Sequence, residues 1–222
     1  MEDSARRTTT DTVYETLHKE IVSLNILPGT KLSETEVAKR FGVSRQPVRN
    51  AFTRLGNEEL LLIRPQKATK VRGFSMDRVA LARLVRLSVE LEIAQCAIAV
   101  WDADSQAKLD ENISLQERAI AKGDLQTFHA LDYDFHNLIC TLSKKPLAFE
   151  VIVDCKQIVD RLCVLSLTKD SEAKAVLEDH RDIAKGLASG DYEKAQGIIR
   201  KHLSRLDDTI DFIHETHPDY FE

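Results

Sequence analysis

The sequence predicts a mainly α-helical protein in two parts, an N-terminal winged helix-turn-helix and a C-terminal all-helical antiparallel bundle. The first observation is that residues 1–72 contain short helical patterns, separated by glycine and proline, that end in two extended apolar runs. The second is that few glycines or prolines interrupt the chain after Gly73, where the apolar spacing is helical throughout. We therefore expect one domain over residues 1–72 and a second over residues 73–222.

The N-terminal part combines three short helices with a two-stranded wing. Apolar residues at helical spacing define the first helix, and Pro28-Gly29 ends it. Ser33 followed by Glu36 is the pattern of a capping box at the start of the second helix, and Ser44 is a suitable cap for the third. The expected elements are helices 13–24, 33–40 and 44–55 and strands 61–64 and 69–72.

The C-terminal part reads as six antiparallel helices joined by short connections, which is typical of a bundle. The breaks between the helices fall at short polar or glycine-containing segments. The expected helices are 76–101, 105–122, 124–143, 145–166, 171–189 and 191–215.

Composition and charge agree with a folded protein that meets nucleic acid through its first part only. The chain is 43% hydrophobic and 30% charged, and its net charge is −5. Residues 1–72 carry 13 basic and 9 acidic side chains, a net charge of +4, so the remainder carries −9. Ordinary surface variation would explain this asymmetry equally well.

Several function classes are disfavoured by the sequence. No apolar run is long enough for a membrane helix, and the N-terminus lacks the apolar stretch of a signal peptide, so we expect a cytoplasmic protein. The four cysteines form no CxxC pair, and we interpret them as reduced packing residues.

The helix expected at residues 44–55 has the pattern of a DNA-recognition helix. Its apolar residues share one face of the helix. It is the second helix of the expected helix-turn-helix, and in that motif the second helix enters the major groove. Arg45 and Arg49 are one turn apart and could contact guanine edges or phosphates; a solvated helix face is the alternative. Wing residues Lys67 and Lys70 would add phosphate contacts. The other candidate DNA contacts on or beside this helix are Ser44, Gln46 and Thr53.

The stretch from Pro28 to Pro65 closely resembles the GntR family signature, in particular its FadR-like branch. The resemblance implies that Arg45 and Arg49 read the operator and that a homodimer binds a short palindrome. Two positions differ from the family pattern: the wing tip is Pro65-Gln66-Lys67-Ala68 where glycine is usual, and Thr35 stands where some members use an arginine for DNA. The matching residues are Gly29, Leu32, Glu34, Val37-Ala38, Gly42-Val43-Ser44-Arg45, Pro47-Val48-Arg49, Ala51 and Arg54-Leu55.

A second constellation lies in the helical part. Asp132 and His136 are four residues apart on one face of a helix, and His180 and His202 each fall within an apolar series on later helices. A buried carboxylate is costly alone, and a divalent metal offsets that cost. Three nitrogens and one oxygen suit zinc, nickel, iron or manganese better than calcium. The alternative is that the histidines are hydrogen-bonded core residues.

The helical part also resembles the ligand-binding FCD domain of this GntR branch, with a length closer to its six-helix, VanR-type subgroup. The resemblance implies that Asp132, His136, His180 and His202 are metal ligands. It implies that Arg86 binds an effector carboxylate, although a salt bridge to Glu90 is an equal alternative. The weaker candidates for the effector pocket are His129, Asn137, Arg161 and Lys145.

These features together predict a regulator that is not an enzyme. We expect it to bind operator DNA as a homodimer and to respond to a small organic acid held beside a divalent metal, with zinc as the first choice. One alternative is a purely structural metal with another effector. A metal-dependent hydrolase is a further alternative, but the sequence supplies no HExxH-like motif with a general base.

Overall fold

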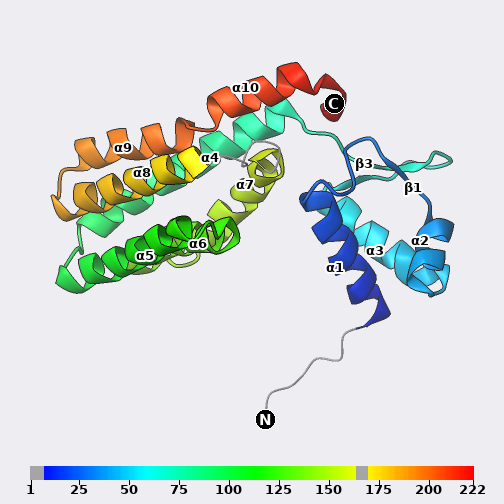
Figure 1. Ribbon diagram of the computed structural model, residues 1–222, viewed down its shortest axis with the longest axis horizontal. Coiled ribbons are helices and arrows are strands. Elements are labelled where there is room, and N and C mark those ends of the chain that lie inside the picture. The colour runs from blue at the N-terminus through cyan, green and yellow to red at the C-terminus, as the bar shows by residue number, and fades with distance from the viewer. Residues whose placement is uncertain (1–7, 164–169) are drawn as a thin grey trace, which may run out of the picture. The chain divides into compact units, whose positions relative to one another are not determined.

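The computed structural model describes residues 8–163 and 170–222, and it confirms the mainly helical class (Figure 1). The chain divides into two compact units, which we describe separately. Unit 1 contains Met1–Met76 and Ile213–Glu222, and unit 2 contains Asp77–Phe212.

Unit 1 is a three-helix winged fold with a small antiparallel sheet. The strands lie in the order β1-β3-β2, so β3 is the central strand. Strand β1 was not expected from the sequence, because two residues are too few to show an alternating pattern. The elements are α1 (Thr9–Val22), β1 (Lys31–Leu32), α2 (Glu34–Phe41), α3 (Arg45–Asn57), β2 (Leu61–Leu62) and β3 (Thr69–Val71).

Local sequence signals explain the helix-turn-helix. Thr8 caps α1 in a reciprocal capping box with Asp11, and the Ser33 hydroxyl accepts a hydrogen bond from the Glu36 N–H at the start of α2. Gly42 ends α2 with φ +66°, a conformation that favours glycine. The apolar face of α3 packs against α1, and this directs its polar face outward. The buried residues of the two helices are Val13, Leu17, Ile21, Val48, Ala51, Phe52 and Leu55.

The end of the chain returns to pair with the segment that follows the wing. The Phe74 N–H donates to the Tyr220 carbonyl at 2.7 Å, and the Glu222 N–H donates to the Phe74 carbonyl at 2.9 Å. A Cβ atom on Gly73 would lie 2.8 Å from the Tyr220 carbonyl oxygen, so this close approach requires glycine. The expected boundary at residue 72 leaves the last residues in the helical domain, whereas this pairing groups them with unit 1.

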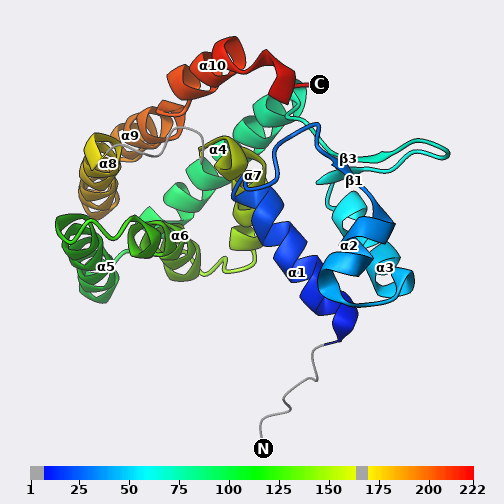
Figure 2. The ribbon, with the colours of Figure 1, turned by 45° about the vertical axis from the view of Figure 1, so that its right-hand side comes forward.

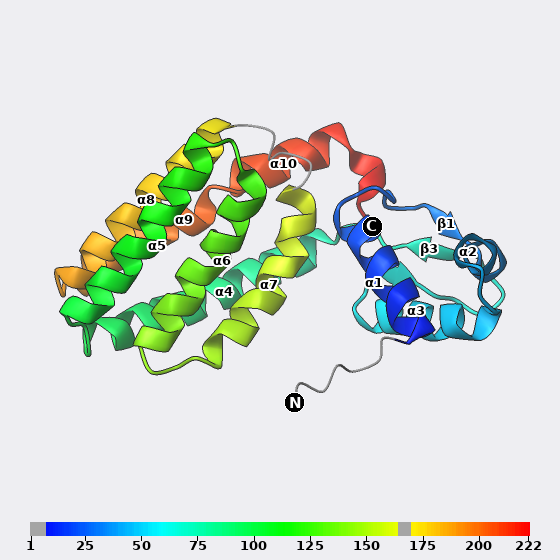
Figure 3. The ribbon, with the colours of Figure 1, turned by 60° about the horizontal axis from the view of Figure 1, so that its bottom comes forward.

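Unit 2 contains helices that pack as successive neighbours. Helix α6 contacts α7 on one side and α5 on the other, α5 contacts α8, and α8 contacts α9 (Figures 2 and 3). Helix α4 contributes Ala94 and Ala97 to their common core. The helices are α4 (Met76–Ile98), α5 (Ala103–Ala121), α6 (Leu125–Leu142), α7 (Ala148–Cys163), α8 (Asp170–Ala188) and α9 (Tyr192–Ser204).

The prediction of one last helix over 191–215 was wrong. The segment forms α9 and a separate helix, α10 (Asp207–Thr216), followed by a 3₁₀ turn at Pro218–Tyr220. No glycine or proline marks the break, which falls at Arg205, whose guanidinium is held by Asp179 of α8. The end of the expected helix 145–166 lies outside the described residues.

The sequence also predicts reduced cysteines and no membrane-spanning helix. Cys96, Cys140 and Cys155 are free thiols. In the ranges 8–163 and 170–222, no helix has the length and apolar character needed to cross a membrane.

Candidate functional site

The exposed face of α3 brings together two of the predicted DNA-reading side chains. Arg45 and Arg49 both form ion pairs with Glu34, the first residue of α2, at 2.9 and 3.1 Å. Hydrogen bonds from Arg49 and Arg45 lower the pKa of the Glu34 carboxyl, so it stays ionised. One carboxylate therefore aligns two guanidinium groups that remain more than half exposed. The sequence motif included Glu34 but gave it no role.

The other predicted DNA contacts lie around this pair. Gln46 donates to Asn50 along α3 at 3.1 Å, and the Thr53 hydroxyl donates to the Arg49 carbonyl at 3.0 Å. Ser44 caps α3 by position but makes no side-chain capping hydrogen bond. The exposed side chains that complete this set are Thr35, Ser44, Lys67 and Lys70.

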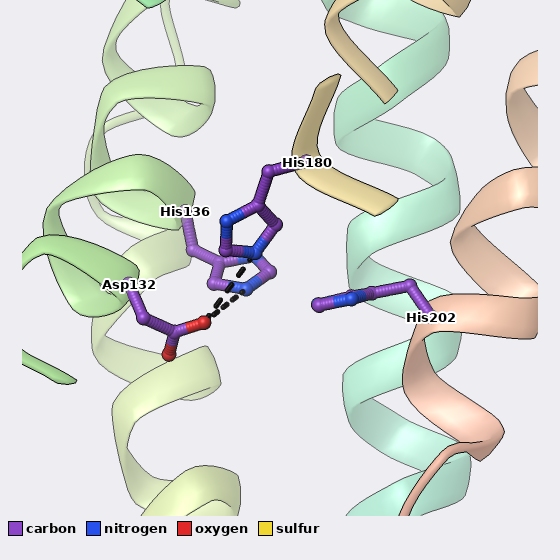
Figure 4. A group of neighbouring side chains, drawn as sticks. All are labelled: Asp132, His136, His180 and His202. Atoms are coloured by element: carbon purple, nitrogen blue, oxygen red, sulfur yellow. Dashed lines mark ion pairs between the residues drawn. The ribbon is translucent and has the colours of Figure 1, made fainter. Parts of the chain in front are cut away.

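In unit 2, the four predicted metal ligands converge. Asp132 and His136 project from α6, His180 from α8 and His202 from α9 (Figure 4). One candidate ligand atom from each residue lies within 4.8 Å of the others, and all four residues are buried. The Asp132 Oδ1 atom is 3.4 Å from His180 Nε2 and 3.8 Å from His136 Nε2. This spacing is suitable for a metal ion between the groups.

Two of the three imidazoles have a hydrogen-bond partner on their other nitrogen, whereas that nitrogen of His202 lies beyond hydrogen-bond distance of the nearest acceptor among the described residues. His136 Nδ1 lies 3.0 Å from Glu90 Oε2, and His180 Nδ1 lies 2.8 Å from Gln116 Oε1. His202 Nδ1 lies 3.6 Å from an oxygen of Asp179. Metal-binding histidines commonly donate their second N–H to such a group, which makes Nε2 the acceptor atom; on His136 that atom already lies 3.1 Å from Arg86 Nη2.

A buried nitrogen without a hydrogen-bond partner in this four-residue cluster is also consistent with metal binding. His180 Nε2 is buried and has no hydrogen-bond partner within the described residues. A buried nitrogen without a partner is unfavourable, and metal coordination would satisfy it. The donor set, three imidazoles and one carboxylate, is that of zinc and neighbouring transition metals.

The electrostatics of the cluster suit cation binding. Burial lowers the pKa of His136 and lowers that of His180 to about 3, so both rings are neutral at pH 7. Burial raises the pKa of Asp132, but the positive charge of Lys156 together with interactions with His180 and His136 outweighs it and keeps the pKa well below its usual range. The Lys156 ammonium donates to Asp132 Oδ2 at 2.7 Å, which leaves Oδ1 facing the histidines.

Most of the residues that support the candidate ligands were not predicted from the sequence. Glu90 appeared only as a salt-bridge partner for Arg86, and the others were not singled out. The available signal was a polar residue within an otherwise apolar helical stripe, as for Gln116 between Leu109 and Ile120. The residues without an assigned role were Asn112, Gln116, Lys156 and Asp179.

A cavity of about 350 Å³ lies beside the cluster. Asp132 and His202 line it, together with Arg86, His129 and Lys156. The rest of the lining includes the apolar side chains of Leu125, Phe128, Val176, Leu203 and Leu206. The cavity therefore combines basic groups near the candidate metal ligands with an apolar wall and with the acidic side chains of Glu172 and Asp208.

Arg86 forms the salt bridge to Glu90 that was one of the two alternatives from the sequence. Its Nε donates to Glu90 Oε1 at 2.6 Å, and its Nη2 lies 3.1 Å from His136 Nε2. It also lines the cavity, so the salt bridge to Glu90 does not remove it from the pocket.

Of the weaker effector candidates, His129 lines the cavity and the other three do not. Asn137 is partly exposed on α6, and Lys145 is exposed before α7. Arg161 is buried on α7, and burial lowers the pKa of its guanidinium to about 10. None of these three lines the cavity among the residues that the structure describes.

The two units together define a DNA-binding transcriptional regulator whose second unit is a separate helical domain. Residues 9–71 match the bacterial regulatory proteins of the gntR family, and residues 83–205 match the FCD domain. The chain belongs to the GntR family and carries a C-terminal FCD domain, as the sequence motifs indicated. It is a regulator and not an enzyme.

Similar proteins agree with this assignment. The HTH-type transcriptional repressor RspR of Escherichia coli (strain K12) is 34% identical over 94% of this chain and 92% of its own length. The gluconate operon transcriptional repressor of Bacillus subtilis (strain 168) is 25% identical over 89% of this chain and 83% of its own. The structure of E. coli McbR/YncC has the same fold, with a TM-score of 0.67 and 20% identity over 95% of this chain and 99% of that chain.

Proposed function

We propose that this regulator binds operator DNA as a homodimer and that a divalent metal and a small organic acid in unit 2 modulate that binding. The observation that carries the proposal is the buried convergence of Asp132, His136, His180 and His202, with a hydrogen-bond partner on the second nitrogen of His136 and of His180. The cavity beside them provides the space for an effector.

The metal is zinc, with nickel, manganese or iron as the other fitting ions. When bound, it would supply a Lewis-acidic positive charge that attracts an anionic effector. The protein's own residues do the positioning: Glu90 and Asp179 orient His136 and His202, and Lys156 directs one oxygen of Asp132 toward the histidines. Arg86 provides the guanidinium fork for a carboxylate.

For DNA, α3 lies in the major groove. Arg45 and Arg49 reach guanine edges, aligned by their shared ion pairs with Glu34. The phosphate and neighbouring contacts come from exposed side chains beside α3 and in the wing. These are Thr35, Ser44, Gln46, Thr53 and Lys67.

The homodimer is formed through exposed apolar side chains of unit 2. Leu81 and Leu84 of α4 are 60% and 62% exposed, Leu147 directly before α7 is 74% exposed, and Val151 of α7 is 41% exposed. Such side chains gather at surfaces that a partner covers, and a second copy would supply one helix-turn-helix for each half of a palindrome. The protein acts in the cytoplasm, where it meets DNA.

A thermal-shift screen tests the sensing proposal. Zinc-loaded protein and a chelated control are melted with a panel of small carboxylates, including gluconate because one relative is named for a gluconate operon. A ligand at 100 times its dissociation constant adds about 2.7 kcal/mol, which raises the melting temperature by several degrees. A response that requires zinc supports the proposal. Zinc binding with no exchangeable position and no carboxylate response would favour a structural metal instead.

A further inference from the structure

A hydrogen-bonded chain of buried amides connects three helices beneath the candidate metal ligands. Asn112 Nδ2 donates to the Leu131 carbonyl of α6 at 3.2 Å, and Gln116 Nε2 donates to Asn112 Oδ1 at 2.6 Å. Gln116 Oε1 then lies 2.8 Å from His180 Nδ1 on α8. We propose that Gln116, oriented by Asn112, is a positioning residue that fixes the tautomer and ring orientation of His180 for metal binding. This inference rests on the metal centre of the proposed function.

The direction of each hydrogen bond follows from the first one. A backbone carbonyl can only accept, so the atom of Asn112 that faces Leu131 must be the amide nitrogen. The Asn112 oxygen then faces Gln116 and requires the amide nitrogen of Gln116. The Gln116 oxygen is left for His180, and it can only accept a proton from Nδ1.

This chain leaves Nε2 of His180 as the nitrogen with the free electron pair. That atom lies 3.4 Å from Asp132 Oδ1, which is also an acceptor. Two acceptors that face each other repel unless a cation lies between them. The tautomer set by Gln116 is therefore the one that can bind a metal together with Asp132.

Because these side chains are buried, the donor and acceptor roles in their hydrogen bonds are well defined. Gln116 and His180 are 0% exposed and Asn112 is 7% exposed, so bulk water does not compete for these hydrogen bonds. The anchoring carbonyl belongs to Leu131, the residue directly before Asp132. Two hydrogen-bonded side chains of α5 thus hold the backbone beside Asp132 and the imidazole ring of His180.

The test compares Gln116→Leu with Gln116→Glu in the full-length protein. Leucine removes the acceptor for His180 Nδ1–H, and we expect zinc affinity to fall about 10- to 100-fold, as is typical when such an outer partner is lost. In its protonated form, a buried glutamate keeps both the acceptor for His180 Nδ1–H and a donor to Asn112 Oδ1, and we expect affinity close to that of the wild type. Gln126→Leu, an exposed substitution on α6, is the matched control. Zinc affinity is measured by competition with a chromophoric chelator.

A second readout separates positioning from general support of the fold. Nitrogen–proton correlation spectra of the imidazoles in metal-free protein report which nitrogen of His180 carries the proton. We expect Nδ1–H in the wild type and in Gln116→Glu, and a mixture of tautomers in Gln116→Leu. Wild-type affinity and an unchanged tautomer in Gln116→Leu, or loss of zinc in a folded Gln116→Glu, would overturn the role of Gln116. A wild-type protein that takes up no zinc would instead overturn the metal centre itself.

Discussion

The two units use the same kinds of charged side chains in opposite settings. In unit 1, Arg45 and Arg49 share Glu34 at the surface, and both guanidinium groups are more than half exposed. In unit 2, Arg86 pairs with Glu90 in a setting where the two side chains are only 12% and 8% exposed. The exposed pairs can be exchanged for phosphate or base contacts at little cost, because water already screens them.

The buried pair behaves differently. Breaking it leaves a charge in a low-dielectric environment, so its geometry is maintained until another charged group arrives. An exposed arrangement suits a large polyanion that approaches from solvent. A buried arrangement beside a cavity suits one small ion or acid that replaces a partner. The difference between the units is therefore one of solvation rather than of residue type.

The sharpest way to break this comparison is to make the same substitution in both units. We expect Arg86→Met to lower the free energy of unfolding by about 3 kcal/mol, because Glu90 stays buried with less compensation. Arg45→Met should change it by less than about 1 kcal/mol, because the ion pair is exposed. Urea unfolding of the two variants measures both values. Equal effects would show that burial does not separate the two pairs.

The metal centre gives the next largest effect. We expect His180→Ala to lower zinc affinity by more than about 100-fold, beyond what loss of an outer partner causes, because a ligand nitrogen is removed. His129→Ala is the matched control, since His129 lines the cavity from α6 but is not part of the four-residue cluster. Isothermal titration with zinc gives the affinities. Full zinc affinity in a folded His180→Ala protein would remove His180 from the ligand set.

For unit 1, we expect Arg49→Ala to weaken binding to a selected operator by about 1–3 kcal/mol, the usual value for an arginine that reads a guanine. The melting temperature should hardly change, because the side chain is exposed. Arg118→Ala, at an exposed position of α5, is the charge-matched control. Fluorescence anisotropy with a labelled duplex provides the affinities. If both variants bind the duplex equally, α3 is not the recognition helix.

The sequence was sufficient for much of this architecture, and the reasons are physical. Helix α3 followed from capping residues and a one-sided apolar pattern, which are local signals. The four candidate ligands followed from polar residues at core positions of α6, α8 and α9 and from the family resemblance. Their convergence could not be derived from periodicity, because it depends on the packing of helices distant in sequence.

The structural features that the sequence did not predict depend on contacts between elements that are distant in sequence. Gln116 reaches His180 only because α5 lies against α8, and the two residues are 64 positions apart. The pairing of Phe74 with Phe221 joins residues 147 positions apart, and no local sequence pattern predicts it. The break before α10 has no glycine or proline, so helix propensity alone predicted one continuous helix over residues 191–215.

The smallest expected effect concerns the cap of α1 and depends on pH. Hydrogen bonds from the Thr8 side chain and backbone, and then from Arg54, lower the pKa of Asp11 to about 2, below its ordinary value of 3.8. A folded-state pKa below the unfolded one means that the ionised cap stabilises fully above pH 3.8, and the gain is lost as pH falls toward 2. We therefore expect Asp11→Asn to destabilise the protein slightly at pH 7 and to reduce the loss of stability between pH 4 and 2.

Urea unfolding of wild type and variant at several pH values measures this difference. Asp154→Asn, an exposed acid on α7, is the control for removing a negative charge. The acid dependence of buried groups such as Asp132 is common to all three proteins and cancels in the comparison. A constant difference between wild type and Asp11→Asn from pH 7 to pH 2 would mean that the charge of Asp11 does not contribute to the cap. An exposed carboxylate held by local hydrogen bonds would then be no more sensitive to pH than an unpaired one.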